Sequence, residues 1–170
     1  MARPHILFVQ AQMIPWARGL HGDARHDVES KLLSRDDTDH SSTCVVRYPA
    51  GWSRDAAEHL ATHEEFLVLD GSITIGARTY DKHAYGFLPA GFVRDRAASA
   101  HGAVLLTMFY GEPTLGRGAS QGFDPKLLFE YVNPLDMEWD PGLVDPQRAR
   151  GVMIKPLRTD PYTGESSFLY

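Results

Sequence analysis

The sequence predicts an all-β protein in which short antiparallel strands form a sandwich or barrel. Short segments rich in β-branched and aromatic residues recur between residues 43 and 111, separated by Gly and Pro turns. No window in that region has a sustained helical period of apolar residues. The chain of 170 residues is long enough for one domain whose core folds without disulfide bonds.

The expected elements follow from their residues in chain order. An edge strand is expected at HILFVQ (5–10), and further strands at TCVVRY (43–48), AYGFL (84–88) and GAVLLTMFY (102–110). The segment EFLVLDGSITI (65–75) predicts two strands around a hairpin turn at Asp70-Gly71, because a DG pair between apolar runs favours such a turn. The segment DPKLLFEYV (124–132) is expected to form one or two helical turns.

Charge and composition disfavour some classes of binding partner and indicate the cellular compartment. The formal net charge of −5 disfavours nucleic acid and anionic membrane surfaces. HILFV is too short for a secretory signal, and no segment approaches the roughly 20 apolar residues of a membrane span. Cys44 is the only cysteine, so no internal disulfide can form and a reducing compartment is expected. We therefore expect a cytoplasmic protein without a nucleic-acid or membrane partner.

The sequence also repeats itself weakly. FVQAQMIPW (8–16) is similar to FEYVNPLDMEW (129–139), and a Lys follows each Trp and opens a second similar run, at Lys31 and at Lys155. Two interpretations stay open: chance similarity in turn-rich sequence, or a duplicated barrel cut short after the first strand of its second unit. Because a terminal strand needs a partner for its backbone groups, we expect a homodimer.

Two stretches resemble the signature motifs of the cupin superfamily. The first signature is Gly, five residues, His, one residue, His, three or four residues, Glu, six residues and Gly, and those positions here hold Gly51, Ala57, His59, Glu64 and Gly71. The second is Gly, five residues, Pro, one residue, Gly, two residues and His, and those positions hold His83, Pro89, Gly91 and Arg94. Two His positions of the family are thus replaced, by Ala57 and by Arg94.

The resemblance covers roughly residues 43–111 and looks most like the cupins of double-barrel proteins and of zinc-binding anti-sigma factor domains. It implies a jelly-roll antiparallel β-barrel with irregular N- and C-terminal arms. We expect an N-terminal arm at residues 1–40 that packs on the barrel, and a barrel core at 41–112. A C-terminal arm at 113–170 would end in a strand like the start of a second cupin repeat.

Metal-binding cupins hold their metal with two His and a Glu from the first signature and a His from the second. This chain keeps His59 and Glu64, which are too few for a tight transition-metal site. His63, if it still lies in the loop, and His101, at the start of the last strand, are candidate replacements. The resemblance therefore implies one divalent metal (Fe, Mn, Ni or Zn) held by these four residues, with a metal-free site as the alternative.

Arg94 suggests a different arrangement, in which a guanidinium replaces the charge of the metal. Arg94 and Glu64 would then form a bidentate pair inside the barrel, because a buried carboxylate without a partner is costly. Two alternatives stay open. Arg94 holds a ligand carboxylate or enolate while His59 or Glu64 serves as acid or base, or Arg94 extends out of the barrel mouth and His59 is a satisfied interior histidine.

The candidate catalytic residues are therefore His59, Glu64 and Arg94. The candidate lining of a substrate pocket is Trp52, Tyr85, Phe87 and Arg94. The resemblance implies a protein that binds a small oxygenated or carboxylated molecule, and an enzyme of dioxygenase, isomerase, lyase or cyclase type with a degenerate metal site. The alternatives are a non-catalytic ligand-binding or sensing cupin and the structural half of a double-barrel assembly, because one fold hosts many functions.

Overall fold

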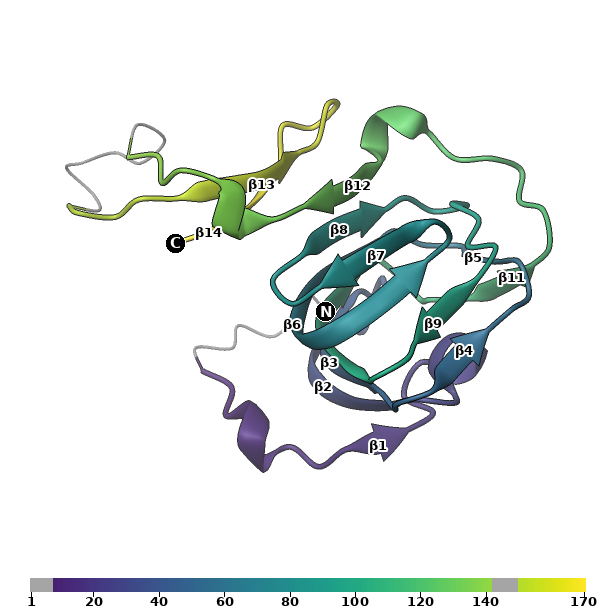
Figure 1. Cartoon of the computed structure of the whole chain (residues 1–170). Coiled ribbons are helices and arrows are strands. Elements are labelled where there is room, and N and C mark those ends of the chain that lie inside the picture. Colours follow the sequence, from purple (N-terminus) through teal and green to yellow (C-terminus); the bar gives the residue numbers. More distant parts are fainter. Residues whose placement is uncertain (1–7, 142–149) are drawn as a thin grey trace.

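The computed structural model describes residues 8–141 and 150–170 and forms an antiparallel all-β jelly roll with two extended arms (Figure 1). The first elements are η1 (Ala11–Met13), β1 (Ala17–Arg18), η2 (Gly22–Arg25), β2 (Glu29–Arg35), β3 (Ser42–Tyr48), β4 (Trp52–Arg54), β5 (Glu58–Leu60) and β6 (Glu64–Ile75), where η denotes a 3₁₀ turn. They are followed by β7 (Arg78–Asp81), β8 (Tyr85–Leu88), β9 (Ala97–Ser99), β10 (Ala103–Phe109), β11 (Leu115–Arg117), η3 (Pro125–Leu127), β12 (Phe129–Val132), η4 (Pro134–Asp136), β13 (Lys155–Thr159) and β14 (Ser166–Leu169). Within the described ranges, no helix has the length and apolar character needed to cross a membrane.

Two sheets share the long strand β6. Its first half lies in the large sheet, whose order is β1-β2-β3-β10-β6-β8-β12, and its second half pairs with β7 and β9. β9 also pairs with β4, while β5 pairs with β11 and β13 pairs with β14. The strands expected at 43–48, 84–88 and 102–110 are confirmed as β3, β8 and β10. Of the strand expected at 5–10, residues 5–7 lie outside the described residues and 8–10 are not in a strand.

The prediction of a hairpin turn at Asp70-Gly71 is wrong, because β6 runs through these residues without reversing. Gly71 has φ +70, and a β-carbon there would lie 2.1 Å from the carbonyl oxygen of Gly102. Glycine is required at this position because the chain bends from one sheet into the other and a second backbone segment approaches it closely. The chain reverses later, at residues 76–77 between β6 and β7.

Side-chain alternation separates two apolar clusters. The main core lies inside the jelly roll and includes Phe66, Val68 and Leu88. Tyr85 and Phe87 alternate with Gly86 and Leu88 along β8, so they lie on the outer face and form a second cluster with Leu157 of β13. The large sheet is therefore covered on its inner face by the barrel and on part of its outer face by the C-terminal arm.

Of the one or two helical turns expected at residues 124–132, the structure forms a single 3₁₀ turn, η3. Asp124 accepts a hydrogen bond from the backbone N–H of Lys126 (2.9 Å) and caps the single 3₁₀ turn η3. The next residues form β12, which pairs with β8 at the edge of the large sheet. The β13–β14 hairpin then lies beyond β12 and β8 (Figure 1).

Candidate functional site in the barrel interior

Glu64 and Arg94 form a buried ion pair inside the barrel. Glu64 begins β6 and is 2% exposed, while Arg94 is 7% exposed and is held by backbone hydrogen bonds to Glu58 in both directions (3.0 and 2.7 Å). Arg94 donates from Nη2 to Oε2 of Glu64 at 2.5 Å. The pairing expected from the sequence is present, through one guanidinium nitrogen. Arg94 therefore lies inside and does not extend from the barrel mouth.

A second set of charges lies beside this pair. Arg54 donates to Oδ1 of Asp27 (2.5 Å) and to Oε2 of Glu58 (3.0 Å), and the indole of Trp52 donates to Oδ2 of Asp27 (2.7 Å). Burial favours a higher pKa for Asp27, but the hydrogen bonds from Arg54 and Trp52 outweigh it and hold this pKa below its usual value. Burial likewise works to lower the pKa of Arg54, and its bonds to Asp27 and Glu58 raise it overall. Arg54 and Arg94 are thus each already paired with carboxylates of this chain.

The cavity between these groups is small. Its polar lining is the Glu64–Arg94 pair and the Arg54–Glu58 pair, its apolar lining comes from the core, and its free volume is about 20 Å³. That volume suits a single water molecule, whereas drug-sized ligands occupy pockets of about 300–1,000 Å³. Trp52 and Arg94 line this cavity as the sequence predicted. In this conformation the cavity has no room for a substrate.

His59 is kept from the family signature but does not line the cavity. It lies on β5 opposite Gly116 of β11, and a β-carbon at Gly116 would lie 2.2 Å from Nε2 of the imidazole. The ring therefore packs on the backbone of β11. Its Nδ1 is buried and has no hydrogen-bond partner among the described residues. The structure thus brings Glu64 and Arg94 together but not His59.

Tyr85 and Phe87 were predicted to line the same pocket, and the structure places them on the outer face of the sheet instead. His63 lies there too: its ring stacks on Phe87 at 5.5 Å, and its Nδ1 accepts a hydrogen bond from the backbone N–H of Ala90 (3.0 Å). Burial, followed by the nearby charge of Arg158, lowers the pKa of His63. These residues belong to a different site because strand neighbours point to opposite faces.

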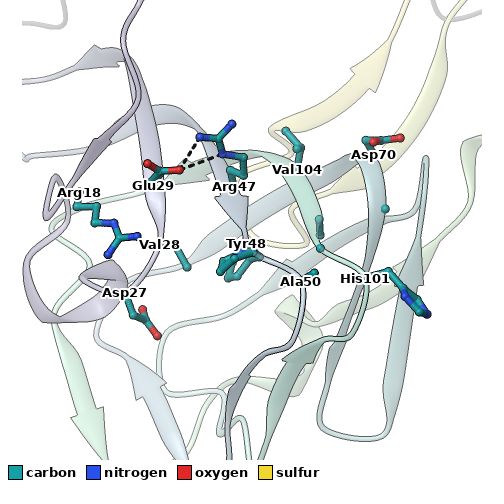
Figure 2. A pocket seen from close by; sticks show the side chains of 14 residues that line it. Arg18, Asp27, Val28, Glu29, Arg47, Tyr48, Ala50, Asp70, His101 and Val104 are labelled. Atoms are coloured by element: carbon teal, nitrogen blue, oxygen red, sulfur yellow. Dashed lines mark hydrogen bonds and ion pairs between the residues drawn. The ribbon is translucent and has the colours of Figure 1, made fainter.

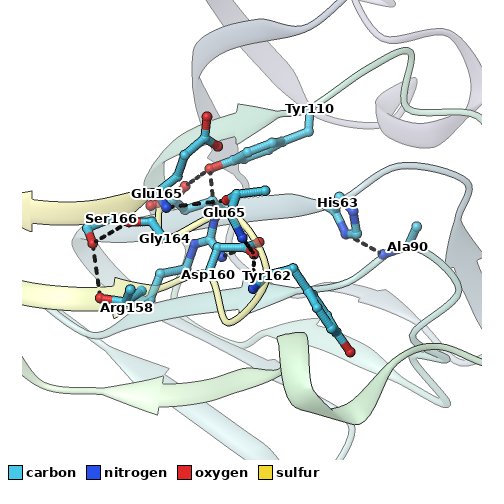
Figure 3. Close-up of polar contacts among 12 residues, drawn as sticks. His63, Glu65, Ala90, Tyr110, Arg158, Asp160, Tyr162, Gly164, Glu165 and Ser166 are labelled. Atoms are coloured by element: carbon cyan, nitrogen blue, oxygen red, sulfur yellow. Dashed lines mark hydrogen bonds and ion pairs between the residues drawn. The ribbon is translucent and has the colours of Figure 1, made fainter.

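This outer site is a polar cluster between the barrel and the C-terminal arm (Figure 3). The carboxylate of Glu65 accepts hydrogen bonds from the hydroxyls of Tyr85 (2.9 Å) and Tyr110 (2.6 Å). The guanidinium of Arg158 lies 3.9 Å from the ring centre of Phe87 and donates to the Tyr110 hydroxyl at 3.5 Å. Burial and the bond to Glu65 raise the pKa of Tyr110 to about 12. Sequence reasoning missed Glu65, Tyr110 and Arg158, although the strand alternation that places Glu64 inside also places Glu65 outside.

His101 lies apart from both sites. It is exposed in an open groove of about 340 Å³ that also includes Arg18, Arg47 and Asp70 (Figure 2). In that groove Arg47 pairs with Glu29, at 2.5 Å. His101 is therefore not positioned to share a metal with Glu64.

The residues present do not fit the metal centre that the cupin resemblance implied. The guanidinium of Arg94 occupies the position of the second-signature His and bonds the carboxylate that would ligate the metal. The four candidate ligands, His59, Glu64, His63 and His101, lie in separate environments, and no group of three or more His, Cys, Asp or Glu side chains suited to a metal occurs within residues 8–141 and 150–170. Arg94 supplies the positive partner that the buried carboxylate of Glu64 requires.

Comparisons with known proteins agree with this fold. A crystal structure of a candidate dioxygenase from Nostoc punctiforme matches with a TM-score of 0.69 and 23% identity, over 83% of this chain and 50% of that chain. A candidate acetylacetone dioxygenase from Methylibium petroleiphilum matches with a TM-score of 0.53 and 19% identity, over 68% of this chain and 90% of that one. A cupin-like protein of unknown function from Ralstonia eutropha matches with a TM-score of 0.54 and 12% identity, over 69% and 79%.

At these identities the solved structures show a common fold alone, and this chain spans half the length of the Nostoc protein. A search of curated proteins found no significant match. The model of the ChrR cupin-like domain family matches residues 5–113, which is more than half of the sequence. The chain therefore belongs to the ChrR cupin-like domain family.

Proposed function

We propose that this chain is a metal-independent, non-catalytic cupin that acts as a binding module. The observation that carries the proposal is the 2.5 Å contact between Arg94 and Glu64, at the position where metal-binding cupins ligate their metal. A metal would have to displace a buried guanidinium from its carboxylate. Breaking a buried pair by losing one partner costs about 3–5 kcal/mol, and an unpaired Arg94 would then oppose a second cation nearby.

The filled interior supports the same proposal. A cavity of about 20 Å³ leaves no space for an organic substrate together with a metal and its open coordination positions. The charges of Arg54 are matched by Asp27 and Glu58 in the same way as Arg94 is matched by Glu64. The filled, charge-paired interior would therefore stabilise the fold, and binding would take place on the outer surface of the protein.

A second candidate is a site for a small carboxylated molecule, and with it the enzyme predicted from the cupin resemblance. It is favoured by the two guanidinium groups, Arg54 and Arg94, that line one cavity beside Trp52. A ligand carboxylate could take the place of Glu64 on Arg94 if the cavity opened. Such a ligand would raise the melting temperature of the wild-type protein by mass action and leave an Arg94→Met variant unchanged.

The two candidates are tested first by metal analysis. Elemental mass spectrometry is carried out on protein purified without an affinity tag or chelator, together with an Ala57→His, Arg94→His variant that restores both family ligands. We expect no stoichiometric metal in the wild type and a gain of metal in the variant. An Ala57→His, Arg96→His variant is the matched control, because Arg96 is exposed and pairs with Asp55 instead of Glu64.

Near-stoichiometric Fe, Mn, Ni or Zn in the unmodified protein would contradict the proposal. Oxygen uptake with acetylacetone, the compound named for the Methylibium relative, provides the matching activity test. We expect no uptake that depends on Glu64. Turnover lost in a Glu64→Gln variant that stays folded would favour the enzyme instead.

A further inference from the structure

The open groove beside His101 has the size of a small-molecule site. Its free volume is about 340 Å³, whereas the interior cavity has about 20 Å³ and ligand pockets usually have about 300–1,000 Å³. The strands β1, β2, β3 and β10 begin or end at this groove, beside the bend of β6 at Gly71. The charged residues that line the groove differ from those that line the interior cavity. The groove is therefore a separate place where a ligand can bind.

Several charges of the groove already have a partner within the chain. The carboxylate of Glu29 accepts two hydrogen bonds from the guanidinium of Arg47, at 3.1 and 2.5 Å. That guanidinium also packs on Trp16, with its carbon 4.2 Å from the ring centre. Asp27 is bonded at both carboxylate oxygens by the guanidinium of Arg54, at 3.1 and 2.5 Å. These charges are therefore not free to bind the charge of a ligand.

Two other charges of the groove are open to a ligand. Arg18, the last residue of β1, is exposed, and its guanidinium makes no ion pair or hydrogen bond with any residue that the structure describes. Asp70 pairs with Lys82 at 3.4 Å, and both side chains are more than half exposed, at 74% and 54%. Exposed pairs of this kind contribute little, so the cation of a ligand can take the place of Lys82. The groove thus offers one cation and one anion.

The two open charges lie on opposite sides of the groove. Figure 2 shows Arg18 on one side and Asp70 on the other, with Tyr48 between them. The lining between the charges is largely apolar and includes Val28, Tyr48, Ala103 and Val104. A molecule that meets both charges is therefore linear, with an anion at one end, a cation at the other end and an uncharged middle.

The lining beside Asp70 indicates what this uncharged middle is. Gly71 and Gly102 both line the groove, and because glycine has no side chain, the lining atoms at these two positions are main-chain atoms. Main-chain N–H and C=O groups are strong hydrogen-bonding groups that an amide can pair with and a hydrocarbon cannot. The lining therefore favours a peptide chain as the middle of the ligand.

We propose that this groove binds a short peptide by its two free ends, with the terminal carboxylate at Arg18 and the terminal ammonium at Asp70. A guanidinium is suited to a carboxylate, because its planar N–H groups match the two carboxylate oxygens. The carboxylate of Asp70 accepts hydrogen bonds only, and a terminal ammonium supplies donors. Capture of the ends of a peptide is a known mode of peptide recognition. The ligand is thus a linear zwitterion of a few residues.

This inference gives the proposed binding role a site and a class of ligand, and it rests on that role. The two proposals fail separately, because the groove and the Glu64–Arg94 pair have different residues. Stoichiometric metal in the barrel would contradict the metal-independent interior and leave peptide binding in the groove unchanged. An absence of peptide binding would overturn the groove as a site and leave the metal content of the barrel unchanged.

Titration of the full chain with trialanine, followed by two-dimensional NMR, tests the groove. Saturable shifts are expected for the backbone amide signals of Tyr48, Ala50, Gly102 and Ala103. Arg18→Gln and Asp70→Asn should each weaken binding about five- to tenfold, because each variant removes one charged contact. Arg96→Gln and Asp55→Asn are the matched controls and should bind as the wild type does. These two residues form an exposed pair (3.2 Å) that lies outside the groove.

Two modified peptides test the orientation of the ligand. N-acetyl-trialanine lacks the ammonium, and trialanine amide lacks the carboxylate. Arg18→Gln should weaken N-acetyl-trialanine and leave trialanine amide unchanged, whereas Asp70→Asn should do the reverse. A general loss of structure would weaken both peptides alike. An absence of saturable trialanine binding, equal losses in the control variants, or equal effects on both modified peptides would overturn the proposal.

Discussion

Glu64 and Glu65 are neighbours in sequence, yet they lie on opposite faces of β6 and are stabilised in different ways. Glu64 faces the interior and is paired with the guanidinium of Arg94. Glu65 faces the C-terminal arm and is bonded by two tyrosine hydroxyls, with Arg158 beside one of them. Both carboxylates are nearly inaccessible, at 2% and 3% exposure. The comparison shows that burial alone does not determine how a carboxylate is compensated.

The difference has a consequence for each face. A fixed ion pair holds two full charges at short range, so the inner site is rigid and costly to break from either side. The hydroxyls that bond Glu65 are neutral, so they stabilise its charge less than a guanidinium would. The nearby cation, Arg158, belongs to the C-terminal arm. The outer site therefore joins the barrel to the C-terminal arm, whereas the inner ion pair belongs to the barrel interior.

The largest expected effect comes from breaking the inner pair. Arg94→Met leaves Glu64 buried without a cation and should lower the free energy of unfolding by about 3–5 kcal/mol in urea denaturation. Combining it with Glu64→Gln should restore part of the loss, because the unpaired charge is then removed as well. The exposed Arg96→Met serves as the control and should change stability by less than about 0.5 kcal/mol. A small loss for Arg94→Met would mean that water or another group already compensates Glu64.

A smaller loss is expected on the outer face. Glu65→Gln keeps an acceptor for one hydroxyl and removes the charge to which Tyr85 and Tyr110 donate. It should therefore lower the free energy of unfolding by about 1–3 kcal/mol. Tyr110→Phe, which removes one donor, should cost about 1 kcal/mol in the same measurement. If Glu65→Gln instead destabilised the protein as much as Arg94→Met, the proposed contrast between the two faces would fail.

The smallest effect concerns acid stability and His63. Burial and Arg158 depress the pKa of its imidazole in the folded state. The unfolded chain therefore binds the proton more readily. The stability linked to His63 is present above the unfolded pKa of about 6.5 and is lost as the pH falls through the folded pKa. Between pH 7 and pH 5 the wild type should lose more stability than His63→Gln, which keeps an acceptor for the Ala90 N–H. A steeper loss in the variant would reverse the sign.

The sequence predicted the strands and the inner pair because both depend on local patterns. The spacing of the two signatures places Glu64 and Arg94 on inward-facing positions. The pairing of Arg54 with Asp27 was missed, because Asp27 lies in the N-terminal arm and no periodicity reveals a contact across 27 residues. Tyr85 and Phe87 were assigned to the wrong face, because a shift of one residue in a strand reverses inside and outside.

The remaining differences have the same origin in long-range contacts. Asp70-Gly71 has the composition of a hairpin turn, but the required glycine is explained by the approach of Gly102, more than thirty residues away. Arg158 carries no local signal for its place over Phe87. The repeat of the arms was visible in the sequence as a weak similarity, and the hydrogen bonds of Lys31 and Lys155 give it physical content.

The continuous course of β6 also affects how the chain is made. One edge of β6 pairs with β7 and β8, which follow it directly in the chain. The other edge pairs with β9 and β10, the last of which ends at Phe109. At about 5–20 residues per second, synthesis of the 34 residues from Ile75 to Phe109 takes about 2–7 s. For that interval the nascent chain displays an uncovered apolar strand. Slow emergence of residues 76–109 from the ribosome should therefore increase capture by chaperones, whereas a pause after Phe109 has emerged should have little effect.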